Sequence, residues 1–332
     1  MANFLETCRA AGGLRNLLES GKDGGQEFRI IGGAQQVSQR LADYIGGENV
    51  HLGSPVYQIS QSTESVTVVT MNGTRFVASH VILAMAPHLV VRINFQPPLP
   101  TWRDQLGQQM PVGHLIKVVI TYRQAFWRQR GYSGQGLSSR GPLCTVFDAC
   151  SADGKTPALV GFIGGAQAIM WATIVAEDRR EAVLEQIAQF FDAQEALVPL
   201  DYAEKDWAKE VYNGGCPVVH MNPGTAATLA WRLRESVGRI HFAGTELATT
   251  WSGFLNGAVE SGQRAAEDVL ALLRAGHDIE TGAVEHFNTP DCTPYPLFPT
   301  PTKSLLQRIE PVLCTVLSFS VLSAAIRFLS TF

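Results

Sequence analysis

Residues 239–266 read R-I-H-F-A-G-T-E-L-A-T-T-W-S-G-F-L-N-G-A-V-E-S-G-Q-R-A-A, and this stretch decides the class of fold. Residues 239–242 are predicted to form a strand, and the residues from 251 onward open a helix. Free amides at a helix start can bind an anionic group such as phosphate. The same helix carries four small residues on one face, which favour either close helix packing or close approach of a ligand: Gly257, Ala258, Gly262 and Ala265.

Two residue patterns that carry chemistry lie before this block. The turn Y-N-G-G-C at 212–216 follows Trp207 and presents Cys216. The apolar run at 115–122 predicts a strand, and Lys117 lies inside it. A lysine within such a run is either an edge residue that blocks further pairing or a charge placed in a cavity.

The remaining patterns predict alternating strands and helices. We expect a short strand at 28–31, a helix after Gly33, a hairpin at 66–76 around Asn72-Gly73, strands at 80–86 and 158–163, and a helix at 178–194. With 332 residues, 45% of them hydrophobic, the chain is expected to form about two domains of α/β or α+β class.

Composition excludes several functional classes. The formal net charge of −4 argues against nucleic acid as a partner. No cysteine or histidine residues follow the spacing of a zinc site, so no metal is expected. No serine lies in a G-x-S-x-G motif, which argues against a serine hydrolase. The six cysteines form no C-x-x-C pair and are expected to be mostly free thiols: Cys8, Cys144, Cys150, Cys216, Cys292 and Cys314.

The last residues differ from the rest of the chain. A stretch rich in proline and threonine at 289–302 precedes an apolar run at 305–332 that carries Arg308 and Arg327. Residues 312–332 reach the length of about 20 that a membrane-spanning helix needs. This pattern favours a C-terminal transmembrane helix as a membrane anchor, with an amphipathic helix packed on the body as the alternative.

Taken together, the sequence resembles the flavin-containing monoamine oxidases. The words that carry the resemblance are, in family order, G-G-Q-E-F-R-I-I-G-G (24–33), P-P-L-P (97–100), P-V-G-H-L-I-K (111–117), F-W-R (126–128), Y-N-G-G-C (212–216) and the block at 239–266. The resemblance implies an FAD-linked amine oxidase fold, with a substrate domain built on a mixed sheet. It divides the chain into residues 1–56 and 206–275 of the FAD-binding domain, 57–205 of the substrate-binding domain, a spacer at 276–304 and an anchor at 305–332.

The resemblance also implies roles for single residues. Cys216 matches the cysteine bonded covalently to FAD, Trp207 packs on the flavin ring, and Lys117 holds a water near flavin N5, which favours the cavity interpretation of this lysine. The family places two tyrosines around the substrate amine, and this chain has Pro217 and Phe254 at those positions. Because neither residue is a tyrosine, the range of substrates stays open. The other cofactor-binding residues are Val56 near the adenine, and Gly244, Thr245, Glu246 and Trp251 around the phosphate and ribityl portion.

The implied function is oxidative deamination of primary amines to aldehyde, ammonia and hydrogen peroxide with FAD and dioxygen. The implied location is the cytosolic face of the mitochondrial outer membrane, with membrane lipid around a single anchor. The sequence does not decide whether the chain forms a homodimer. The family's G-x-G-x-x-G segment is not found in this chain, which is expected to start after it. The alternative is a non-catalytic, membrane-anchored fragment or isoform that does not retain flavin, and a polyamine oxidase is a weaker third interpretation.

Overall fold

The computed structural model describes residues 8, 12–13 and 28–275, and these residues form two compact units. Unit 1 contains residues 28–110 and 221–275, and unit 2 contains residues 111–220. The sequence-based division placed boundaries at 56/57 and 205/206, so the structural boundaries at 110/111 and 220/221 differ from it. Which ligand each unit binds stays a prediction. The predicted spacer and membrane anchor at 276–332 lie outside the described residues. No helix in the described part of the chain is both long enough and apolar enough to cross a membrane.

Unit 1 contains a mixed four-stranded sheet with the strand order β3-β2-β1-β5. Strands β1, β2 and β3 are antiparallel, and the Asn72-Gly73 turn joins β2 to β3 as predicted, whereas β5 runs parallel to β1. The strands of this sheet are β1 (Val56–Gln61), β2 (Val66–Thr70), β3 (Arg75–Ala78) and β5 (Asn94–Gln96). Unit 1 also contains the helices α3 (Gln35–Ile45), η1 (Gly47–Asn49), α9 (Thr225–Thr228) and η4 (Ala230–Arg232).

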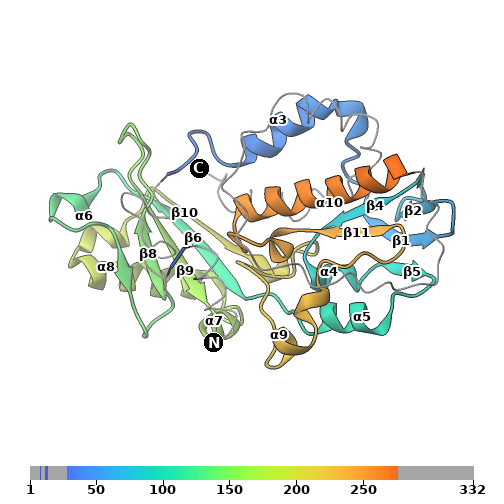
Figure 1. The fold of residues 1–332 in the computed structure, drawn as a ribbon. Helices are drawn as coiled ribbons and strands as arrows, with labels where there is room; N and C mark the ends of the chain where they lie inside the picture. Colours follow the sequence, from blue (N-terminus) through green and yellow to red (C-terminus); the bar gives the residue numbers. More distant parts are fainter. Residues whose placement is uncertain (1–7, 9–11, 14–27, 276–332) are drawn as a thin grey trace. The chain divides into compact units, whose positions relative to one another are not determined.

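Unit 1 also contains a parallel pair of strands, β4 (Val81–Ala84) and β11 (Ile240–Ala243). The long helix α10 (Leu255–Ala275) runs along this pair, and the short helices α4 (Pro87–Val90) and α5 (Thr101–Gln108) lie at its other side (Figure 1). From α5, the Arg103 guanidinium stacks 3.4 Å above the Phe242 ring and donates to the Leu233 carbonyl oxygen at 2.7 Å. Parallel strands are usually covered on both faces, and this pair follows that rule.

Unit 2 is built on an antiparallel five-stranded sheet with the strand order β10-β6-β9-β8-β7. Its elements are β6 (Leu115–Thr121), α6 (Phe126–Gln129), β7 (Gly136–Leu137), β8 (Thr145–Asp148), β9 (Ala158–Gly164), α7 (Ala166–Trp171), α8 (Ala176–Phe191), η2 (Gln194–Leu197), β10 (Asp201–Asp206) and η3 (Trp207–Lys209). The substrate domain was expected to be built on a mixed sheet, but the sheet of unit 2 is antiparallel throughout, and the mixed sheet belongs to unit 1.

The core of unit 2 lies between one face of this sheet and α8. Alternate residues of β6 point into it, with Ile116 and Val118 fully buried. From α8, Val183, Ile187 and Phe191 recur every four residues and fill the same core. This packing leaves the opposite face of β6, which carries Lys117, free of the core.

One predicted element is wrong. Residues 28–30 are not a strand, and the chain turns directly after them, where the Gly33 amide donates to the Ile30 carbonyl oxygen at 2.9 Å. Phe28 and Ile31 are each 86% exposed. A strand needs a neighbour to pair with, and no described strand lies beside this segment.

Candidate functional site

The predicted site residues fall into two groups, one in each unit. Lys117, Trp207, Cys216 and Pro217 belong to unit 2. The second group belongs to unit 1: Val56, Gly244, Thr245, Glu246, Trp251 and Phe254. Each group is described within its own unit.

In unit 2, Lys117 lies on an interior strand of the sheet. Strand β6 pairs with β10 on one side and with β9 on the other, and Lys117 stands opposite Lys205 and Phe162. The edge-strand interpretation of this lysine is therefore wrong. Its side chain is half-buried, on the face of β6 that does not pack on the core.

Trp207 follows the last residue of β10 and is almost fully buried, with 4% of its surface exposed. It begins the short 3-10 helix η3, whose N-cap is Asp206. The Asp206 carboxylate accepts the Ala208 amide at 3.1 Å and thereby fixes the main chain on both sides of the indole.

The glycine turn that carries Cys216 packs backbone to backbone against the start of the β6 segment. The Cys216 amide donates to the Gly113 carbonyl oxygen at 2.9 Å, and the Gly113 amide donates to the Val218 carbonyl oxygen at 3.2 Å. A Cβ atom on Gly215 would overlap the Gly113 carbonyl oxygen, and one on Gly113 would lie 2.7 Å from the Cys216 carbonyl oxygen. Both positions therefore require glycine because the two backbone segments approach so closely.

The Cys216 thiol is buried, and one acidic and one basic side chain act on its pKa. Burial is the largest of the effects that raise its pKa to about 12, and the nearby Asp206 carboxylate acts in the same direction, whereas a hydrogen bond with the Leu115 backbone and the Lys117 ammonium act in the opposite direction. The thiol is therefore protonated at neutral pH until something displaces the proton. Lys117 and Asp206 both lie close enough to Cys216 to act on its charge.

In unit 1, the turn between β11 and α10 is held by side-chain hydroxyl groups. The Thr245 hydroxyl accepts the Gly253 amide at 2.7 Å and donates to the Phe254 carbonyl oxygen at 2.9 Å. The Gly244 amide donates to the fully buried Ser261 hydroxyl at 3.1 Å. These bonds fix the glycine turn against the start of α10.

Close contact also explains a small residue of α10. A Cβ atom on Gly257 would overlap the Trp251 carbonyl oxygen. Of the two functions that the sequence left open for the small residues, close packing is therefore the one observed at this position.

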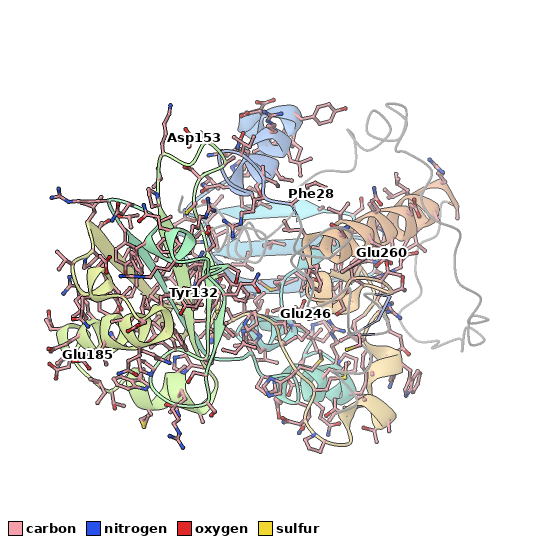
Figure 2. The ribbon with its side chains drawn as sticks, turned by 90° about the vertical axis from the view of Figure 1, so that its left-hand side faces the viewer. Phe28, Tyr132, Asp153, Glu185, Glu246 and Glu260 are labelled. Carbon is pink, nitrogen blue, oxygen red and sulfur yellow. The ribbon has the colours of Figure 1, made fainter. Side chains whose placement is uncertain are left out.

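Glu246, which is labelled in Figure 2, lies in the same turn. The residue as a whole is half-buried, but its Oε2 atom is fully enclosed and has no hydrogen-bond partner within the described part of the chain. Burial raises the pKa of this carboxyl group to about 7. A neutral Glu246 carboxyl group can donate a hydrogen bond as well as accept one.

Three further predicted residues complete the group in unit 1. Trp251 adopts a positive φ of 52°, and its ring meets the Phe254 ring edge-on at a centroid distance of 5.2 Å. Val56 is the first residue of β1 and is half-buried. The aromatic pair forms a wall beside the start of α10.

Two residues of unit 2 were not assigned a role from the sequence. His114 Nε2 lies 2.9 Å from Asp206 Oδ1. Each residue neighbours a predicted one, since His114 lies in the P-V-G-H-L-I-K word and Asp206 precedes Trp207. No sequence signal links them, because 92 residues separate the two positions.

Comparison with known proteins shows similarity over most of this chain. The family model of flavin-containing amine oxidoreductases matches residues 4–270. A protein from Dictyostelium discoideum named probable flavin-containing monoamine oxidase A is 40% identical over 81% of this chain and 59% of its own length. Flavin-containing amine oxidase A from Bos taurus is 40% identical over 81% of this chain and 51% of its own length. The chain thus spans about half the length of the curated relatives that it matches.

Solved structures show the same fold. Cyclohexylamine oxidase from Brevibacterium oxydans superposes with a TM-score of 0.75 and 34% identity, over 80% of this chain and 58% of that protein. Putrescine oxidase bound to putrescine superposes with a TM-score of 0.76 and 32% identity, over 81% of this chain and 59% of that protein. The extent of the match and the shared α/β fold show that this chain belongs to the family of flavin-containing amine oxidoreductases.

Proposed function

We propose that the protein oxidises primary amines to aldehyde and ammonia, with FAD as cofactor and with dioxygen reduced to hydrogen peroxide. One observation carries this proposal: a glycine turn presents the buried Cys216 thiol beside Lys117, and a hydrogen-bonded main chain links this turn to Trp207. The names of the relatives support amine oxidation with a flavin.

Taken separately, each unit has residues that fit a part of such a cofactor. In unit 2, Cys216 could form a thioether bond with the flavin ring, and the Trp207 indole could stack on it. In unit 1, the Gly244 turn brings backbone and the enclosed Glu246 carboxyl group together, since a Cβ atom on Gly244 would lie 3.2 Å from Glu246 Oε2. This unpartnered oxygen suits a hydroxyl group of the ribityl chain or, when protonated, a phosphate oxygen.

When bound, FAD would supply the acceptor for a hydride from the amine and the centre at which dioxygen is reduced. The other tasks belong to residues of the chain. Lys117 Nζ would hold a water molecule and provide positive charge near the reacting atoms. The Phe254 ring would form an aromatic wall for the amine, whereas Pro217, at the position of the family's other tyrosine, provides no aromatic ring.

The covalent bond gives a direct test. Purified protein should absorb as a flavoprotein, and after precipitation with acid the flavin should stay with the polypeptide. Cys216→Ala should move the flavin to the supernatant, because no other thiol lies in this turn. Cys144→Ala is the matched control, since Cys144 is also a free thiol of unit 2. Purified protein without any flavin would favour the non-catalytic alternative.

We also propose that residues 305–332 anchor the protein to the mitochondrial outer membrane with its body in the cytosol. The support is the apolar composition of this run, whose length at about 1.5 Å per residue reaches the hydrocarbon thickness of about 30 Å. Carbonate extraction should leave the full chain in the membrane pellet, and a chain truncated before Lys303 should be released. Release of the full chain by carbonate would contradict the proposal.

A further inference from the structure

The His114–Asp206 pair joins two neighbouring strands inside unit 2. His114 lies directly before β6, and Asp206 is the last residue of β10, opposite Ile116. The two side chains are 21% and 9% exposed, so this bond is largely shielded from water. Because an ionised carboxylate only accepts hydrogen bonds, Nε2 of the histidine donates across the 2.9 Å contact.

The pair restrains the main chain at Trp207. Asp206 Oδ1 accepts both the His114 ring N–H and the Ala208 amide. Trp207 therefore lies between the residue that provides the carboxylate and the residue whose amide binds it. Any movement of the carboxylate would move the indole with it.

Main-chain hydrogen bonds continue from Trp207 to the glycine turn. The Glu210 amide donates to the Trp207 carbonyl oxygen at 3.2 Å, and the Gly214 amide donates to the Glu210 carbonyl oxygen at 2.7 Å. The Cys216 amide then donates to the Gly113 carbonyl oxygen at 2.9 Å. Gly113 immediately precedes the histidine, so this path returns to its starting point. The histidine–aspartate bond closes a ring of contacts that includes both Trp207 and Cys216.

We propose that His114 and Asp206 are positioning residues that hold the Trp207 indole and the Cys216 thiol at the spacing required for flavin attachment. The inference rests on the proposed function for its purpose, but its geometry does not depend on a bound flavin. Asp206 has a second effect, because its negative charge lies near the thiol and opposes formation of the thiolate.

Substitutions separate the two effects. His114→Ala opens the ring of contacts, whereas His114→Gln retains an N–H donor and should restore it. Asp206→Asn keeps an oxygen that can accept both hydrogen bonds and removes only the charge. Two exposed residues of unit 2 provide matched controls, His220→Ala for the loss of a ring and Asp201→Asn for the loss of a charge on the same strand.

The first measurement needs no flavin. Alkylation of Cys216 in the flavin-free full-length chain is followed by mass spectrometry of its peptide, with Cys144 and Cys150 as internal controls of folding. Asp206→Asn should speed this alkylation by about three- to tenfold, because less negative charge favours the thiolate. His114→Ala should also speed it by releasing the turn, and His114→Gln should return it to the wild-type rate.

The second measurement is the rate at which added FAD becomes acid-stable on the polypeptide. A misplaced thiol should attach flavin about tenfold or more slowly in His114→Ala, with recovery in His114→Gln. If the wild-type chain takes up no flavin, the proposed function fails while the alkylation rates still decide the positioning role. If His114→Ala leaves both the alkylation and the attachment rates at wild-type values, the positioning proposal is overturned.

Discussion

Glu246→Gln should make unit 1 more stable above neutral pH and leave its stability almost unchanged in mild acid. Burial raises the pKa of the Glu246 carboxyl group from its ordinary value of 4.5 to about 7. The folded state therefore holds a proton that the unfolded state releases between these two values. Stability from this group is fully present below pH 4.5 and is lost as the pH rises through about 7.

The shift sets the size of the effect. One unit of pKa corresponds to about 1.4 kcal/mol, so ionisation of Glu246 should cost the folded state about 3 kcal/mol. Glutamine has a similar shape and never ionises. The free energy of unfolding is compared between the variant and the wild type at two pH values. The advantage of the variant should be about 3 kcal/mol larger near pH 9 than near pH 5. Constant effects of the substitution, such as an altered hydrogen bond, cancel in this comparison.

Hydrogen exchange of amides in β11 and α10 measures the free energy of opening in unit 1 alone. Wild type and variant are compared at the same pH, so the pH dependence of intrinsic exchange cancels as well. Glu64→Gln is the matched control, because Glu64 is an exposed carboxylate of the same unit. An equal difference between Glu246→Gln and wild type at both pH values would refute the reasoning from the enclosed carboxyl group.

Three further predictions concern both units. Lys117→Met should slow turnover about tenfold or more while flavin stays bound, because the variant loses the positive charge near the reacting atoms. Stopped-flow measurement of the oxidation of the reduced flavin gives the rate. A wild-type rate in the variant would contradict the proposed role of Lys117. Burial and the neighbouring His80 lower the pKa of His241 from 6.5 to about 4, so unit 1 should lose about 3 kcal/mol of stability as the pH falls between these values. His241→Gln should flatten that part of the profile in urea unfolding. Gly215→Ala should destabilise the Cys216 turn and abolish covalent flavin attachment, because the added methyl group would overlap the Gly113 carbonyl oxygen. Acid-stable flavin at the wild-type level would contradict this prediction and show that the turn accommodates the methyl group.

Local patterns predicted many elements of this fold. The Asn72-Gly73 hairpin joins β2 to β3 as expected, and the strand at 239–242 and the helix after Trp251 occur as β11 and α10. These elements combine a strong periodicity with a specific turn residue, so the sequence signal is local. The four described cysteines are free thiols, as expected from their spacing.

Strand β10 shows where local patterns fail. Its residues 201–206 read D-Y-A-E-K-D, which contains four charged residues and gives no apolar alternation. The segment forms an edge strand, and charged side chains at an edge discourage further pairing. Strand β10 takes its place in the sheet by pairing with β6. The apolar residues of β6 that face the core fix that strand, and β6 in turn sets the register of β10. Composition alone cannot identify such a strand.

The candidate site shows the same limit in its chemistry. Cys216 and Trp207 were found because a glycine turn and a family motif mark them in the sequence. Their mutual placement depends on the bond between His114 and Asp206, two residues that only the pairing of β6 with β10 brings together. The same pairing shows that Lys117 lies on an interior strand, a question that the apolar run around it had left open. Sequence therefore predicts which residues touch the cofactor, whereas the sheet register determines which neighbours orient these residues and set their charge.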